Sequence, residues 1–364
     1  MGENAETGAG MTDPMIVATA DALRSGAARL LHAAGAGEED ARVAADHLVE
    51  ANLRGHDSHG VGMLPLYVRA ILAGRLDPKA HVRIEDRGGA VLAADGRRGL
   101  GQVVARQAIA AGMARARATG VAVVALRDAF HIGRIGTYAE QAAADGFVSV
   151  HFVNVVGHPP FVAPFRGGDA RLGTNPFCAA VPAVRGKPAV VLDFATSELA
   201  LGKVRVALQR GERVREGALI DASGRPSTDP AVMYGDQRGA LLPFGLHKGY
   251  GLALVCELLG GALTGGGTMV SVPSAPDQAL NGMLSFVVDP RRMPGAERLG
   301  EEIATVIDHV KASPPADPDL PVLVAGEPEL ATRAERLAHG IAVEQATWEQ
   351  LRAAAGSVGT TWET

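Results

Sequence analysis

The chain is poor in cysteine and aromatic residues and has no long apolar run, and these absences exclude several classes of protein. Its 364 residues include two cysteines, Cys178 and Cys256, and 4% aromatic residues. Two cysteines in so long a chain form no disulfide framework, and neither lies at zinc-ligand spacing from a Cys or His. Because both have apolar neighbours, we expect buried thiols that behave as small hydrophobic residues. The longest apolar stretches are strand-sized or broken by glycine, so no membrane-spanning segment is expected.

Concentrated positive charge is also missing. The formal net charge is −5, and no Lys/Arg-rich tract occurs. A nucleic-acid partner is therefore not expected, because phosphate binding needs a basic surface. The first residues, Met1-Gly2-Glu3-Asn4, include an acid where a signal peptide needs a basic flank. We expect a cytoplasmic protein that begins with a disordered lead over residues 1–12.

The usual nucleotide-binding and hydrolytic motifs are absent. Gly99-Leu100-Gly101-Gln102 lacks the third glycine of GxGxxG, and the Gly-rich stretch 260–267 follows a predicted helix instead of opening one. There is no GxxxxGK[ST], no HExxH and no GxSxG. Motif patterns alone therefore predict an α/β protein without a Rossmann fingerprint.

The hydrophobic pattern predicts two packed units. A chain of this length exceeds the size at which single cores stop growing, roughly 250–300 residues. Helical spacing covers 14–53 with a turn at 35–37, then 63–73, 101–118, 136–145, 249–263, 297–312 and 328–355. Short apolar strands are predicted at 82–84, 90–92, 121–126, 148–153, 190–193 and 283–288, with a hairpin and loop over 211–239. We expect a helical unit from both chain ends, 13–79 plus 297–364, and an α/β nucleotide-binding domain at 80–296.

The segment His56-Asp57-Ser58-His59-Gly60 is the first candidate site. Histidine donates or accepts a proton near neutral pH, and an adjacent hydroxyl or carboxylate can fix its tautomer. Asp57 or Ser58 could equally cap the helix that follows. A metal shared by His56 and His59 is a third possibility, although no carboxylate-rich partner segment accompanies them.

Four further segments carry polar side chains, and three of them also contain glycine. Asp128–Gly133 follows an apolar strand, where ligand crevices of parallel sheets lie, and glycine there lets a helix start close to a phosphate. In Gly173–Pro176 an asparagine is held extended before proline. Asp193–Ser197 places a carboxylate where it could orient a histidine. Lys248, between glycines at a predicted helix start, is the best candidate for an anion contact. Each is also explained by an ordinary turn or cap.

Taken together, these segments resemble the malate/L-lactate dehydrogenase family of the second type. The resemblance spans about 15–355, and this family includes 2-hydroxy-acid, ureidoglycolate and sulfolactate dehydrogenases and cyclic-imine reductases. The motifs that carry it are DSHG at 57–60, HIGRIGTYAEQ at 131–141, GTNP at 173–176, LDFATS at 192–197, PFGLHKGYGLAL at 243–254 and AGE at 325–327.

The resemblance implies a non-Rossmann NAD(P)-binding α/β fold, a homodimer, and a small 2-hydroxy or 2-oxo acid as substrate. His59 matches the family's proton donor and acceptor, with Ser58 and Asp193 as relay partners. His131, Thr174 and Asn175 match substrate-binding positions, and no metal is implied. The cofactor is NAD or NADP, with NAD favoured. Matching cofactor positions are His131, Ile132, Gly133, Arg134, Ile135, Thr174, Asn175, Thr196, Ser197, Lys248, Gly326 and Glu327.

Two departures from the family pattern bear on the substrate. In many members, an arginine four residues after the catalytic histidine holds the substrate carboxylate. Here that position is Met63. The nucleotide loop reads Ala325-Gly326-Glu327 in place of a PGE-type sequence. The alternatives are reduction of a cyclic imine carboxylate with the same histidine, and a nucleotide-binding protein without turnover.

Overall fold

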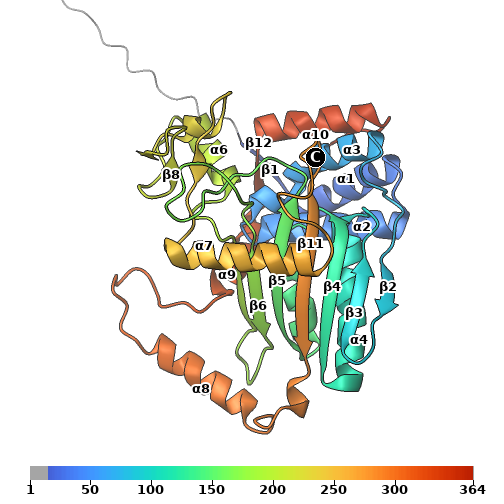
Figure 1. The fold of residues 1–364 in the computed structure, drawn as a ribbon, viewed down its shortest axis with the longest axis vertical. Coiled ribbons are helices and arrows are strands. Elements are labelled where there is room, and N and C mark those ends of the chain that lie inside the picture. The colour runs from blue at the N-terminus through green and yellow to red at the C-terminus, as the bar shows by residue number, and fades with distance from the viewer. Residues whose placement is uncertain (1–14, 364) are drawn as a thin grey trace, which may run out of the picture.

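The computed structural model describes residues 15–363, so the lead expected over 1–12 lies outside the described residues. Four helices form a layer at one side of the molecule: α1 (Ala20–Ala33), α2 (Glu38–Leu53), α3 (Leu64–Leu72) and α10 (Gln345–Ser357) (Figure 1). The predicted stripe of α1 is buried, with Leu23, Ala27, Leu30 and Leu31 almost inaccessible. Residues from the two ends of the chain therefore share one hydrophobic core.

A two-stranded sheet ties the chain ends together where the sequence predicted only helix. Strand β1 (Met15–Ala18) pairs antiparallel with β12 (Ile341–Glu344). The helix predicted over 328–355 is therefore two helices, α9 (Glu327–His339) and α10, separated by β12. Gly340, at φ 89°, ends α9, and a Cβ there would lie 2.6 Å from Val17. Such short strands gain their stability from pairing, which local periodicity does not reveal.

The centre of the molecule is a seven-stranded sheet in the order β2-β3-β4-β11-β5-β6-β7. The bounds are β2 Arg83–Asp86, β3 Val91–Asp95, β4 Val121–Phe130, β11 Leu280–Val288, β5 Val148–Val156, β6 Phe177–Val181 and β7 Val190–Phe194. Strand β6 was not predicted from the sequence. Only the β3–β4 pair is parallel in the described sheet, so β4, which leads into the Asp128–Gly133 segment, runs parallel to β3 and antiparallel to β11. A strand that is buried on both faces is apolar whether it runs parallel or antiparallel to its neighbours, so its sequence does not reveal its direction.

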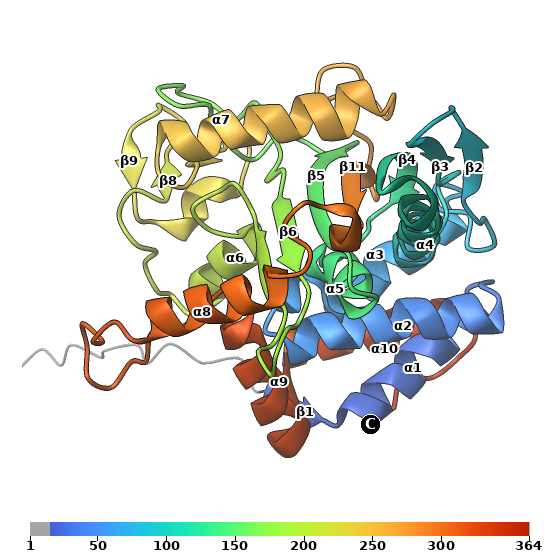
Figure 2. The same cartoon turned by 90° about the horizontal axis from the view of Figure 1, so that it is seen from below.

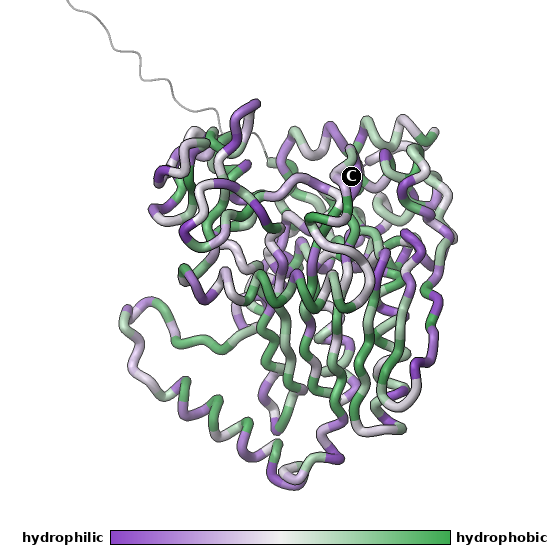
Figure 3. Tube along the Cα trace, in the orientation of Figure 1, coloured by the Kyte–Doolittle hydropathy of each residue, from purple (hydrophilic) through white to green (hydrophobic). Residues whose placement is uncertain are grey.

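Helices cover both faces of this sheet. Figure 2 shows α7 (His247–Cys256) across one face, and α4 (Gly101–Thr119) and α5 (Gly136–Ala144) across the other. A π-helical turn, η4 (Glu257–Leu263), continues α7 and packs on β5 and β11. The hydropathy colouring follows this arrangement, with apolar residues concentrated along the strands and α7 (Figure 3). Cys178 and Cys256 are fully buried in this region, as predicted.

Residues beside β7 form a smaller lobe with its own core. Strands β8 (Leu219–Ile220), β9 (Pro226–Ser227) and β10 (Ala240–Leu241) make an antiparallel sheet, which confirms the predicted hairpin. The lobe also contains a helix that the sequence did not predict, α6 (Leu201–Gln209).

Helix α8 (Leu299–Lys311) lies apart from α1, α2 and α3, with which the sequence analysis had grouped it (Figures 1 and 2). Its Asp308 contacts Lys187, and Gly300 lies close to Val184. None of the helices among residues 15–363 has the length and apolar character needed to cross a membrane.

Candidate active site

His59 lies on a tight turn between α2 and α3. The turn is a short 3-10 segment, Asp57–His59, and Asn52 at the end of α2 holds both sides of it. The Asn52 Nδ2 donates to Asp57 Oδ1 at 2.7 Å, and its Oδ1 accepts from the Val61 N–H at 2.9 Å. A Cβ on Gly60 would lie 2.2 Å from Asn52 Oδ1, so only glycine fits beside this amide. The DSHG sequence thus forms a rigid platform that fixes the position of His59.

The ring of His59 contacts His131, which follows directly after β4. His59 Nδ1 lies 3.1 Å from His131 Nε2, and the rings are stacked with centroids 5.2 Å apart. On its other side, His131 Nδ1 lies 2.7 Å from the Tyr67 hydroxyl of α3. The Gln102 Nε2 of α4 donates to this hydroxyl at 2.6 Å and to the His131 carbonyl oxygen at 3.2 Å. A polar chain therefore runs from Gln102 through Tyr67 and His131 to His59.

The hydrogen-bonding atoms of this chain allow two proton arrangements. In the first, the Tyr67 O–H donates to His131 Nδ1, so His131 Nε2–H donates to His59 Nδ1. In the second, His59 Nδ1–H donates to His131 Nε2 and His131 Nδ1–H donates to the Tyr67 oxygen. The Tyr67 hydrogen then turns to the His131 carbonyl oxygen, which lies 3.3 Å away. Only the second arrangement leaves His59 Nε2 with a lone pair when the ring is neutral.

Burial keeps every member of the chain uncharged. It lowers the pKa of His59 from 6.5 to about 4, helped by the positive charges of His56 and Arg134. Burial also lowers the pKa of His131 well below its usual value, with smaller effects from His59 and His47. The pKa of the Tyr67 hydroxyl is raised by burial, so it remains a neutral donor and acceptor. Two neutral imidazoles can share one proton without repulsion, which suits proton exchange at His59.

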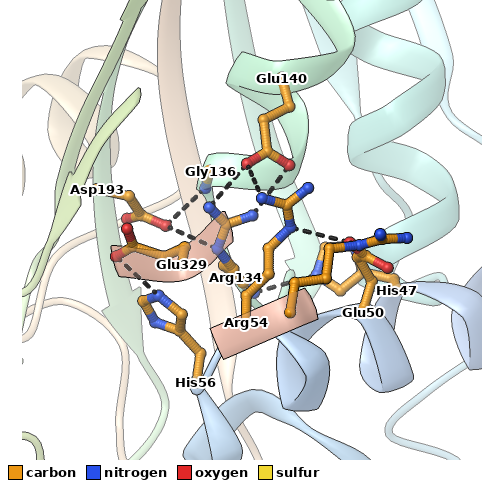
Figure 4. A network of polar contacts seen from close by, with 10 residues as sticks. His47, Glu50, Arg54, His56, Arg134, Gly136, Glu140, Asp193 and Glu329 are labelled. Carbon is orange, nitrogen blue, oxygen red and sulfur yellow. Dashed lines mark hydrogen bonds and ion pairs between the residues drawn. The ribbon is translucent and has the colours of Figure 1, made fainter. Parts of the chain in front are cut away.

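Arg134 is the centre of a second polar network beside the histidines (Figure 4). Its guanidinium donates two hydrogen bonds to Glu140, at 2.9 and 3.1 Å. Glu140 also pairs with Arg54 at 3.1 Å, and Arg54 pairs with Glu50 at 2.9 Å. Bidentate bonds of this kind are strong and directional, and Arg134 is itself 2% exposed. The network fixes the loop that carries His131.

Asp193, at the end of β7, faces this network instead of His59. Its Oδ2 accepts from the Gly136 N–H at 2.7 Å and lies 3.8 Å from Arg134. The carboxylate thus sits at the N-terminus of α5, where the helix dipole favours negative charge. Burial raises the pKa of Asp193, and the charge of Arg134 acts against this rise. The ring partner of His59 shown by the structure is His131, and direct orientation of His59 by Asp193 or Ser58 stays a prediction.

The loop after His131 is tightly packed. The Ile132 N–H donates to Asn281 Oδ1 at 3.0 Å, and Ile135 is buried. Gly133 has φ 73°, and a Cβ there would lie 2.4 Å from His47 Nε2. That nitrogen accepts from the Arg134 N–H at 3.1 Å, so glycine is required for His47 to reach the backbone.

Ser58 lies on the exposed side of the turn, facing the start of α6. A Cβ placed on Gly202 would be 3.0 Å from the Ser58 Cβ. His56, beside it, pairs with Glu329 of α9 at 3.6 Å. Within residues 15–363, no group of three or more His, Cys, Asp or Glu side chains is placed to hold a metal ion.

The GTNP and LDFATS segments lie against one another. The Thr196 hydroxyl donates to the carbonyl oxygens of Thr174 and Asn175, each at 3.0 Å. The Asn175 Nδ2 donates to Glu257 Oε2 at 2.7 Å, while its buried Oδ1 has no hydrogen-bond partner among residues 15–363. Ser197 pairs with Pro243 in an isolated bridge. Three segments distant in sequence therefore meet at the end of β7.

The remaining predicted positions lie further out. Lys248 is exposed in the first turn of α7, two residues after Leu246 at φ 58°. Gly326, at φ 97°, caps α9 and packs against the backbone of Val191 in β7. Glu327 accepts from Lys311 and from the Val324 N–H, and both interactions lower its pKa. Gly326 and Glu327 thus lie beside β7, and Lys248 lies at the start of α7.

Sequence reasoning missed Tyr67, Gln102 and the Arg54–Glu140 pair. Tyr67 and Gln102 lie in segments that were predicted correctly as helices, but only the burial of both polar groups shows their role. A glutamine among apolar residues immediately after Gly101 was the one available signal. Buried amides and hydroxyls need partners, and those partners come from other elements.

Comparisons with known proteins identify the family of this chain. The family model for malate/L-lactate dehydrogenase matches residues 18–352. The chain belongs to the malate/L-lactate dehydrogenase family. It is 47% identical to hydroxycarboxylate dehydrogenase B of Escherichia coli strain K12 over 91% of each chain. Relatives in this family are named hydroxycarboxylate, L-lactate and L-sulfolactate dehydrogenases, which supports a hydroxy-acid dehydrogenase.

Solved structures of relatives show the same fold. The sulfolactate dehydrogenase of Methanocaldococcus jannaschii superposes with a TM-score of 0.85 at 33% identity, covering 95% of this chain and 98% of that one. The delta1-piperideine-2-carboxylate reductase of Pseudomonas syringae pvar. tomato gives a TM-score of 0.78 at 29% identity, covering 93% and 100%. The predicted fold class, the non-Rossmann α/β fold of type-2 malate/lactate dehydrogenases, is therefore confirmed.

Proposed function

We propose that this protein is an NAD(P)-dependent dehydrogenase that interconverts small 2-hydroxy and 2-oxo carboxylic acids, with His59 exchanging the proton on the substrate oxygen. The observation that carries this proposal is the buried chain Gln102–Tyr67–His131–His59. A chain of neutral groups that ends on one half-buried imidazole suits general acid–base catalysis, because it stabilises both protonation states of that ring.

His59 performs its proton transfer in the second arrangement of the chain. In the oxidation direction, His59 Nε2 accepts the proton of the substrate hydroxyl, and the resulting imidazolium donates through Nδ1 to His131. In the reduction direction, the same imidazolium returns the Nε2 proton to the substrate oxygen. Throughout, the Tyr67 oxygen accepts from both Gln102 and His131. Tyr67 and Gln102 are therefore positioning residues that favour the reactive tautomer.

The segments around β7 and α5 are suited to a dinucleotide. The unpartnered Asn175 Oδ1 offers an acceptor for an amide, while the Lys248 side chain is exposed for a phosphate. Among the family-matched cofactor positions, His131 to Ile135, Thr174, Thr196, Ser197, Gly326 and Glu327 would complete the site. The bound nicotinamide supplies or takes the hydride. NAD is the favoured form, and a buried Asp193 beside the loop is compatible with either form.

The substrate is expected to be a small and rather apolar 2-oxo acid. Met63 stands where many relatives carry the arginine that holds the substrate carboxylate, and here it packs half-buried against the helical core. The carboxylate must then be held by other donors. Substitution Met63→Arg is expected to shift the preference toward dicarboxylic 2-oxo acids.

A homodimer fits the outer face of α7 and η4. Leu254, Leu258 and Leu263 are 38%, 50% and 64% exposed there, and Val255 is 40% exposed. A row of large apolar side chains on one helix is typical of an interface. Reduction of a cyclic imine carboxylate remains the second candidate function, favoured by the structural match to a piperideine carboxylate reductase.

The test follows the absorbance of NADH and of NADPH on adding pyruvate, oxaloacetate, phenylpyruvate and a cyclic imine carboxylate. We expect oxidation of cofactor with at least one 2-oxo acid, and a fall of about 10²–10⁴-fold in turnover for His59→Ala. His81→Ala, an exposed histidine paired with Asp40, is the matched control and should keep full turnover. Near-normal turnover of the His59 variant would remove the proposed role, and activity only with the imine would select the second function.

A further inference from the structure

A cavity lies between the helical layer and the helices that cover the sheet. It has a volume of about 530 Å³ and is lined by α1, α2, α4 and α5. This volume falls within the usual range of small-molecule sites, roughly 300–1,000 Å³. None of the positions matched to substrate or cofactor in the family lines it. The Arg134 network of Figure 4 separates it from Asp193, with His47 and Glu50 on the cavity side.

Several polar groups of the cavity wall have no partner within residues 15–363. The Gln102 side chain is 1% exposed, and its Oε1 makes no hydrogen bond. Its Nε2 already donates to Tyr67 and to the His131 carbonyl oxygen, and a reversed amide would place Oε1 against that carbonyl oxygen. The Thr137 Oγ1 is likewise buried without a partner. Buried polar groups are nearly always satisfied, so these atoms indicate a missing donor in the cavity.

The wall also offers donors. Because His47 Nε2 accepts from the Arg134 N–H, the proton of this neutral imidazole lies on Nδ1, for which the described residues provide no acceptor. The Arg106 guanidinium makes no ion pair with any residue that the structure describes. Arg24, in contrast, is already paired with Asp46 at 3.3 Å and with Glu50 at 3.9 Å. The free donors therefore suit a carboxylate, and the free acceptors suit an N–H group.

We infer that this cavity binds a small zwitterion of the α-amino-acid class. Two arginines and two carboxylates line it, so the wall carries no net charge and opposes neither end of such a ligand. The carboxylate of the ligand meets Arg106 and His47 Nδ1–H. Its ammonium group meets Gln102 Oε1, Thr137 and the exposed carboxylate of Asp46. Tyr138 and Val43 supply the apolar part of the wall.

The cavity connects to the proposed proton chain through one residue. Gln102 lines the cavity, and its Nε2 donates to Tyr67 and to the His131 carbonyl oxygen. A ligand that donates to Oε1 would hold this amide in place, so occupancy is expected to change the turnover of the enzyme. This connection rests on the proposed function, whereas the binding itself does not.

The test is calorimetric titration of the full-length protein with each of the twenty common L-amino acids, together with propionate and ethylamine. We expect at least one amino acid to bind, while propionate and ethylamine do not. Arg106→Ala and Thr137→Val should each weaken this binding roughly tenfold or more, since a hydrogen bond to a charged group is lost. Arg352→Ala, an exposed arginine on α10 that is remote from the cavity, is the matched control and should bind normally.

The proposal is overturned if no amino acid binds at millimolar concentration, if propionate binds as well as the amino acid, or if the Arg106 and Thr137 variants bind like the wild type. Turnover is then measured with and without the bound amino acid in wild type and in Arg106→Ala. A change confined to the wild type supports the connection through Gln102, and equal turnover overturns that connection. Because binding is measured by heat, failure of the dehydrogenase assay would not affect the first result.

Discussion

The role of Tyr67 can be separated from its contribution to stability by comparing two buried tyrosines. Tyr67→Phe keeps the ring and removes the oxygen that accepts from Gln102 and contacts His131 Nδ1. Gln102 Nε2 retains the His131 carbonyl oxygen as acceptor, so His131 Nδ1 is the atom left without a partner. An unsatisfied buried group costs about 1–3 kcal/mol, and we expect a loss of roughly 2 kcal/mol in the free energy of unfolding.

The loss of a partner for His131 Nδ1 also disfavours the reactive tautomer, in which His59 Nε2 has a free lone pair. Without the Tyr67 oxygen, the proton of His131 moves to Nε2, which places the proton of neutral His59 on its own Nε2 and blocks the base. Protonated His59 likewise loses the acceptor for its Nδ1–H. A bias of 1–3 kcal/mol corresponds to roughly tenfold to hundredfold in population. We therefore expect kcat to fall by about that factor in both reaction directions, with KM little changed.

Tyr138→Phe is the matched control. The Tyr138 hydroxyl donates to the Ile132 carbonyl oxygen in the same loop but has no contact with either histidine ring nitrogen of the chain. Both variants should lose similar stability in urea unfolding, while only Tyr67→Phe should lose turnover. If Tyr67→Phe is destabilised but fully active, or if Tyr138→Phe loses as much kcat, the assigned role of Tyr67 is refuted.

Three further predictions follow from the site. Gly60→Ala should lower turnover about hundredfold, because its Cβ would displace Asn52 and shift the turn by about 1 Å. Gly62→Ala is the control and should be tolerated in the same assay, because its Cβ would lie 3.4 Å from the nearest atom. Burial lowers the pKa of His47 to about 3, so the unfolded chain binds its proton first as pH falls below 6.5. In urea unfolding at pH 7 and pH 5, His47→Gln should lose roughly 2 kcal/mol less of the free energy of unfolding than the wild type, and the remaining loss comes from other buried histidines such as His59 and His131. Because the pKa of His59 lies near 4, kcat/KM for oxidation should rise with pH up to about pH 5 and stay level above it. The kcat/KM for reduction should fall as pH rises, because that direction needs protonated His59. An oxidation profile still rising at pH 8 would contradict this.

Local sequence patterns determined most of the elements. The helices α2 and α4 bury a continuous stripe of residues, and the strand β11 is buried on both faces. The apolar pattern of such long segments is therefore enough to identify them. The motifs around His59, His131 and Asp193 were also recognisable, because each places polar residues next to a predicted helix or strand. What the pattern could not give was strand direction, since apolar strands look alike whether parallel or antiparallel.

Only the tertiary structure decided how these motifs meet. The β1–β12 pair joins the two ends of the chain, and four-residue strands carry too little local information to be recognised without their partner. The contact between His59 and His131 spans 72 positions, and the Tyr67 and Gln102 groups that support it come from two further helices. Sequence determined which residues are polar and buried, but the partner of each buried polar group depends on packing between elements. Asp193 shows the difference, because its position at a strand end was visible in the sequence, and its contacts with Gly136 and Arg134 were not.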